Sequence, residues 1–231
     1  MGGKEMIPIV AYVLCIVGLA VQASFIAAEN KEKYVPAVIL KGSASFIFVI
    51  IGLIAFRSVS DTAFGKMVVL GLLFGALGDI LLNLRYLSEK NGQKIFLAGI
   101  AVFLTGHIMY LVALLPLSDN PAVPVIAGAV CAALLLAYIF RTMTVKKAFK
   151  IFGIFYVGAI MIMTAVAIGN VISVQTGGRI LFAVGAVLFT ISDIILIFNT
   201  FGGKSTLLWR VVNLFCYYAG QLLIACSVFL M

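Results

Sequence analysis

The chain is dominated by long apolar runs, and these constrain its fold more than any other feature. About eight runs can be marked, over residues 6–28, 36–56, 65–87, 94–115, 121–140, 148–170, 179–201 and 207–230. Each has roughly the 20 residues that a helix needs to cross the hydrocarbon core of a bilayer. Backbone N–H and C=O groups in lipid must form their hydrogen bonds within the segment, so each run is predicted to be a helix. The expected fold class is all-α: a polytopic integral membrane protein, with one transmembrane domain over residues 1–231.

The composition supports this class. Hydrophobic residues make up 64% of the chain and charged residues 10%, whereas a soluble domain carries about 25% charged residues. The chain must therefore face lipid over most of its surface, and a multi-pass location in the cell membrane is expected. The net charge of +8 does not indicate a nucleic-acid partner, because the basic residues cluster at the ends of apolar runs. Membrane lipids are the expected surroundings, and the oligomeric state is left open.

Neither a metal nor a cofactor is indicated. All four cysteines lie inside apolar runs and form no CxxC motif, so they are interpreted as small apolar residues. The single histidine, His107, cannot supply a histidine-rich zinc site within one chain.

The distribution of lysine and arginine predicts the orientation. On the side of the N-terminus lie Lys4, Arg57, Lys66 and Arg179. On the opposite side lie Lys31, Lys33, Arg85, Lys90, Lys94, Arg141, Lys146, Lys147, Lys150, Lys204 and Arg210. Cytoplasmic loops carry the excess of positive charge. Both termini are therefore expected outside the cytoplasm.

Two aspartates lie deep in apolar runs, unlike the other acidic residues, which fall in or beside predicted loops. Asp79 follows Gly78 and Asp193 follows Ser192, and each is followed by an apolar stretch. At 1.5 Å per residue, both lie roughly 9–12 Å inside the cytoplasmic boundary. A carboxylate there costs on the order of 2.5–3.5 kcal/mol, so a functional role is the default interpretation, with a structural cross-link between helices as the alternative.

Several other polar side chains fall on helix faces near these aspartates. Asn83 shares a face with Asp79. His107 and Tyr110 share a face of the predicted helix 94–115. Asn213, Tyr217 and Gln221 share a face of the predicted helix 207–230. Each either lines a pocket or only links helices. Lys41 either reaches to the membrane surface or acts as a counter-ion that keeps one aspartate ionised while the other stays protonated.

The sequence resembles the YhhN-like lysoplasmalogenase family of polytopic membrane proteins. The segments that carry the resemblance are Lys41, GALGDILL at 75–82, FLAG at 96–99, FLTGHIMY at 103–110, GAVLFTISD at 185–193 and YYAGQ at 217–221. The resemblance covers almost the whole chain. It implies an eight-helix membrane hydrolase whose substrate is a lysophospholipid, lysoplasmalogen, cleaved at its vinyl ether to a fatty aldehyde and a glycerophospho-base.

That chemistry suits the residues found. Protonation of the vinyl ether creates an oxocarbenium ion, so the site needs a general acid beside a negative charge, as in glycoside hydrolysis. Asp79 and Asp193 are the predicted catalytic pair, with their two roles unassigned. Lys41, Asn83, His107, Tyr110, Asn213, Tyr217 and Gln221 are the predicted substrate-binding or supporting residues.

Two other classes stay open. A small proton-coupled transporter also carries intramembrane acidic residues. The sequence similarity between the segments around Asp79 and Asp193 is consistent with a weak parallel repeat. Against a transporter, no pair of helices is broken by Pro or Gly at corresponding positions. The third class is a lipid-binding or structural membrane protein without turnover.

Overall fold

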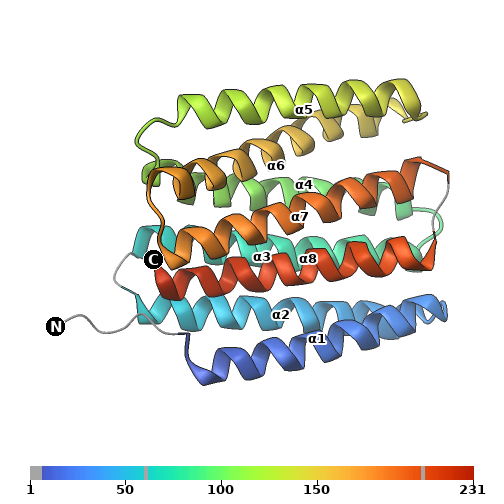
Figure 1. Ribbon diagram of the computed structural model, residues 1–231. Coiled ribbons are helices and arrows are strands. Elements are labelled where there is room, and N and C mark those ends of the chain that lie inside the picture. Colours follow the sequence, from blue (N-terminus) through green and yellow to red (C-terminus); the bar gives the residue numbers. More distant parts are fainter. Residues whose placement is uncertain (1–6, 60–61, 204–205) are drawn as a thin grey trace.

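The computed structural model describes residues 7–59, 62–203 and 206–231, and within these ranges it contains eight α-helices and no strand (Figure 1). The helices are α1 (Ile9–Asn30), α2 (Tyr34–Ser58), α3 (Thr62–Leu84), α4 (Gly92–Leu114), α5 (Ala122–Thr142), α6 (Lys147–Ser173), α7 (Gly177–Phe201) and α8 (Leu207–Ser227). Short 3₁₀ turns extend three of them: η1 (Arg85–Leu87), η2 (Leu115–Leu117) and η3 (Val228–Leu230). Each of the eight described helices is long and apolar enough to cross a membrane, which confirms the all-α, multi-pass membrane class.

The observed helix bounds differ from the expected ones by a few residues. α2 begins at Tyr34 instead of residue 36, so Pro36 lies in its first turn. Proline is tolerated there because the N–H that it lacks has no partner within the helix in the first turn. α6 continues to Ser173, three residues past its expected end. The last three residues of the expected 65–87 helix form η1 instead of α-helix. α1 begins after Pro8, whose backbone is extended, and the expected start at residue 6 lies outside the described residues.

The helices form an antiparallel bundle in which helices distant in sequence become neighbours. α8 packs along α7 and also contacts α1, α2 and α3, while α6 lies against α4, α5 and α7. At the edges of the bundle, α5 packs on α6 and α1 packs on α2 and α8 (Figure 1). The aspartate-bearing helices α3 and α7 therefore face the same interior, flanked by α2, α4, α6 and α8.

Glycines allow some of these helices to pack closely. A Cβ added at Gly185 of α7 would lie 2.7 Å from the carbonyl oxygen of Gly220 of α8, and one at Gly220 would lie equally close to the carbonyl of Gly185. A Cβ at Gly106 of α4 would lie 3.1 Å from the carbonyl oxygen of Gly71 of α3. Small residues at such crossings let the backbones approach. This packing brings the polar faces of α3, α4, α7 and α8 within hydrogen-bonding reach.

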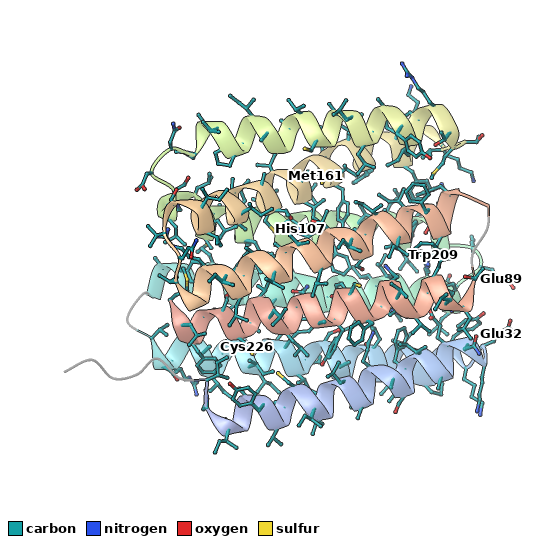
Figure 2. All side chains as sticks on the ribbon, viewed as in Figure 1. Glu32, Glu89, His107, Met161, Trp209 and Cys226 are labelled. Carbon is teal, nitrogen blue, oxygen red and sulfur yellow. The ribbon has the colours of Figure 1, made fainter. Side chains whose placement is uncertain are left out.

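One end of the bundle carries most of the described basic residues, and we call it the basic end. The connections α1–α2, α3–α4, α5–α6 and α7–α8 lie there, at the right of Figure 1. Glu32, Glu89 and Trp209 mark the same end in Figure 2. Lys4 and Lys204, two of the basic residues that predict the orientation, lie outside the described residues.

Candidate functional site

A cavity of about 630 Å³ enters the bundle from the basic end. Its walls come from α1, α2, α3, η1, α4, α6, α7 and α8. Exposed residues such as Tyr86 line its mouth, and side chains that are almost fully buried line its inner part. The cavity is therefore a pocket that joins the surface of the basic end to the interior of the bundle.

Both predicted aspartates line this cavity. Asp79 is 3% exposed and Asp193 is 6% exposed, and they enter the cavity from α3 and α7. Four other predicted residues line it as well: Lys41, Asn83, Asn213 and Tyr217. The structure thus brings together the two carboxylates that helical depth placed at one level.

Asp79 lies in a strongly polar setting. The ammonium Nζ of Lys41 lies 3.4 Å from its Oδ1. The hydroxyls of Ser45 and Tyr217 both donate to its Oδ2, over 2.5 Å and 2.7 Å. Lys41 also lies over the Tyr217 ring, 4.3 Å from the ring centroid. Lys41 is only 2% exposed, so its side chain ends inside the bundle beside Asp79 and does not reach to the membrane surface.

Asp193 has fewer charged neighbours. The hydroxyl of Tyr156 donates a hydrogen bond to its Oδ2. His107 Nε2 lies 4.0 Å from the same oxygen and 3.4 Å from the Tyr156 hydroxyl. Within the described residues, Asp193 has no lysine or arginine partner, and its Oδ1 makes no hydrogen bond. The two carboxyl groups therefore share a cavity but differ in their immediate surroundings.

Three predicted residues lie behind the cavity wall instead of lining it. The hydroxyl of Tyr110 donates to Gln221 Oε1 over 2.7 Å, and Gln221 Nε2 donates to the Tyr217 hydroxyl over 3.4 Å. His107 is 1% exposed, and its ring packs on Phe189 near the middle of the bundle (Figure 2). These three residues therefore do not line the cavity. Gln221 contacts Tyr217 and His107 contacts Tyr156, the two hydroxyls that donate to Asp79 and Asp193, whereas Tyr110 contacts Gln221.

Sequence reasoning missed two hydroxyl groups of the site. Ser45 lies one helical turn after Lys41 on α2, and this spacing could have identified it. Tyr156 lies on α6, which the sequence showed only as an apolar run. Its hydrogen bond to Asp193 depends on the packing of α6 beside α7, so no local pattern could have identified it.

The mouth of the cavity carries paired charges. Arg210 Nη2 of α8 lies 2.8 Å from Glu29 Oε2 of α1. The Arg85 guanidinium of η1 lies over the Phe96 ring, 4.3 Å from its centroid. Such a rim can bind an anionic group through its guanidinium groups and a cationic group through Glu29. Among the described residues, no group of three or more His, Cys, Asp and Glu side chains is placed to hold a metal ion.

Comparison with known proteins assigns the family. The sequence model of the YhhN family matches residues 38–228, which run from α2 into η3 and include both aspartates. No curated protein and no solved structure matches the chain significantly. Because the family match extends over most of the chain, this protein belongs to the YhhN family.

Proposed function

We propose that this YhhN-family membrane protein is a hydrolase that cleaves the vinyl ether bond of lysoplasmalogens. The products would be a fatty aldehyde and a glycerophospho-base. One observation carries the proposal: two buried carboxyl groups with different partners line a single cavity. Paired carboxyl groups in unequal surroundings are the usual means of dividing acid and base roles between identical side chains.

The partners of each carboxyl group support a division of roles. Asp79 faces the Lys41 ammonium and accepts two hydroxyl hydrogen bonds, a setting that favours the ionised carboxylate. Asp193 has no such cation among the described residues, so the protonated acid is assigned to it. Because Tyr156 occupies its Oδ2, the acidic proton is placed on Oδ1.

The reaction then proceeds in three steps. Asp193 donates its proton to the β-carbon of the vinyl ether, and the resulting oxocarbenium ion is stabilised by the negative charge of Asp79. Water adds to the oxocarbenium carbon and returns a proton to the Asp193 carboxylate, which gives a hemiacetal. The hemiacetal then collapses: its hydroxyl loses a proton as the C=O bond forms, the bond to the glycerol oxygen breaks, and that oxygen takes up a proton, which releases the aldehyde and the glycerol hydroxyl.

The cavity has two kinds of wall, as an amphiphilic substrate requires. Polar and charged residues come from α1, α2, α3 and α8, including Asn83 and Asn213. The wall formed by α4 and α6 is mostly aromatic and aliphatic, with Phe96, Ile100 and Phe103 on α4. The guanidinium groups and Glu29 at the mouth complement a phosphate and an amine in a lipid headgroup. With the basic end in the cytoplasm, the lipid would enter from the cytoplasmic leaflet.

The test is the release of aldehyde by the purified protein in detergent or nanodiscs. The proposal expects equal amounts of fatty aldehyde and glycerophospho-base from lysoplasmalogen. It expects no cleavage of the saturated 1-O-alkyl analogue, which has no double bond to protonate. Uptake of the lipid into proteoliposomes without any aldehyde would contradict the proposal and favour a carrier.

A further inference from the structure

Asn83, near the end of α3, is a buried residue of the cavity wall whose side chain bonds only to its own helix. It is 7% exposed. Its Nδ2 donates over 3.0 Å to the backbone carbonyl oxygen of Asp79, one turn earlier in α3. Inside a helix that carbonyl also accepts the backbone N–H four residues further on. The side-chain bond therefore neither links two helices nor supplies a missing backbone partner.

The amide oxygen of Asn83 faces the cavity. A backbone carbonyl only accepts hydrogen bonds, so the contact with Asp79 identifies the nearer amide atom as Nδ2 and leaves Oδ1 directed away from the helix backbone. Among the described residues Oδ1 accepts no hydrogen bond, and it is not sealed in the interior as the amide oxygen of Asn170 is. An unpaired amide oxygen in a buried site costs free energy unless a donor reaches it.

The other buried asparagine of the cavity wall is explained by helix packing. Asn213 of α8 is also 7% exposed, but its Nδ2 donates to the backbone carbonyl and to the hydroxyl oxygen of Ser192. These bonds link α8 to α7. Asn83 makes no such link, so its amide is the one for which the packing of the described helices gives no reason.

Asn83 lies between the carboxyl groups and the mouth of the cavity. α3 runs toward the basic end, so Asn83 is about 6 Å from Asp79 along the helix axis on the side of the mouth. Arg85 and Tyr86, which follow it in η1, line the mouth. In a lysophospholipid the glycerol hydroxyl lies between the ether oxygen and the phosphate. A lipid with its ether at the carboxyl groups and its phosphate at the mouth therefore brings this hydroxyl to the level of Asn83.

The hydroxyl groups beside the two carboxyl groups already use their protons. Ser45 and Tyr217 donate to Asp79, and Tyr156 donates to Asp193. A ligand group at this level therefore gains more by donating a hydrogen bond to a free acceptor than by accepting one. A free hydroxyl group can donate, whereas an ester or an ether at the same carbon cannot.

We propose that the amide oxygen of Asn83 accepts a hydrogen bond from the free glycerol hydroxyl of the ligand, and that it selects lipids in which this hydroxyl carries no second chain. That the ligand is a glycerol lipid rests on the proposed function. The selectivity itself is tested by binding alone, with lipids that are not cleaved.

The probes are three saturated 1-O-alkyl phospholipids with one headgroup and one chain length. The hydroxyl at the second glycerol carbon is free in the first, replaced by hydrogen in the second and methylated in the third. The wild-type protein should bind the hydroxyl probe roughly tenfold or more tightly than the hydrogen probe, because the hydrogen probe leaves a buried acceptor unpaired. The methylated probe should bind no better than the hydrogen probe.

Asn83→Leu replaces the amide by an apolar group of similar size. It should reduce the preference for the hydroxyl probe to within about twofold and keep the affinity for the hydrogen probe. Asn199→Leu is the matched control, because Asn199 of α7 also lines the cavity, six residues after Asp193 and closer to the mouth. Its preference should equal that of the wild-type protein. Each preference is a ratio within one variant, so a loss of folded protein cancels.

The inference is overturned if Asn83→Leu keeps the wild-type preference or if Asn199→Leu loses it to the same extent. It is also overturned if the wild-type protein binds the three probes equally or binds none of them. If Asn83→Leu does not fold, Asn83→Ala carries the same comparison. A preference that depends on Asn83, without aldehyde release from lysoplasmalogen, would support the subsite and contradict the proposed reaction.

Discussion

Lys41 and Asp79 form an ion pair inside the bundle, with the ammonium nitrogen 3.4 Å from the carboxylate oxygen. The pair joins α2 to α3, and both residues are almost fully buried. It is also the main difference between the two carboxyl groups of the cavity, because Asp193 has no lysine or arginine partner within the described residues. The assignment of Asp79 as the ionised carboxylate therefore depends on Lys41.

Removal of Lys41 should destabilise the protein more than removal of the whole pair. Lys41→Met leaves Asp79 buried without its cation, and loss of one partner of a buried pair costs about 3–5 kcal/mol. Lys41→Met with Asp79→Asn should recover most of that loss. The measurement is the free energy of unfolding of the single and double variants in mixed micelles. Equal destabilisation by Lys41→Met and by the double variant would show that the pair is not energetically coupled.

Tyr156 should affect turnover through Asp193. Tyr156→Phe keeps the ring and removes the hydroxyl that donates to Asp193 Oδ2, so the acidic proton is no longer confined to Oδ1. Asp193 becomes a carboxylate as it gives up its proton, and a lost hydrogen bond to a charged group corresponds to about 1.5–3 kcal/mol, so kcat should fall by tenfold or more. Tyr138→Phe on the exposed face of α5 is the control and should leave kcat unchanged. A wild-type kcat for Tyr156→Phe would remove this hydroxyl from the account.

The crossing of α7 and α8 should not tolerate a methyl group. The Cβ of Gly185→Ala would meet the Gly220 carbonyl oxygen at 2.7 Å, so the helices must separate. We expect a loss of at least about 1–3 kcal/mol, as for overpacked interiors. Gly158→Ala is the matched control, since its Cβ meets nothing within 4 Å and helix propensity favours alanine by about 1 kcal/mol. Thermal unfolding of both variants measures the difference, and equal unfolding temperatures would contradict this close packing.

The orientation of the bundle can be tested by cysteine labelling in intact cells. Glu89→Cys lies at the basic end and Asp119→Cys lies in the opposite connection, between η2 and α5. With the basic end in the cytoplasm, a membrane-impermeant maleimide should label Asp119→Cys and should label Glu89→Cys only after lysis. The wild-type chain gives the background from its own cysteines. The reverse pattern would place the cavity mouth on the outer side.

The sequence was sufficient to predict the fold class, because apolar length and composition leave little choice for a chain in lipid. The helix ends were less predictable. α2 begins before Pro36 and η1 ends α3 as a tighter turn, since the last hydrogen bonds of a helix depend on local geometry that the apolar pattern does not record.

Asp79 and Asp193 can be recognised in the sequence alone, because a carboxyl group within an apolar run is rare. The other partners were not equally visible. Tyr156 looks like one more aromatic residue of an apolar run. Its hydrogen bond to Asp193 forms only when α6 packs beside α7 and one face of α6 becomes a wall of the cavity.

The central claim is that Asp79 and Asp193 act together as carboxylate and acid on a vinyl ether. The most direct measurement is aldehyde release from lysoplasmalogen by purified Asp79→Asn and Asp193→Asn, with the exposed Asp119→Asn as control. The account predicts a loss of about 10²–10⁴-fold in each cavity variant, with binding of the uncleaved 1-O-alkyl probe retained and Asp119→Asn unaffected. Wild-type aldehyde release by either cavity variant would contradict it.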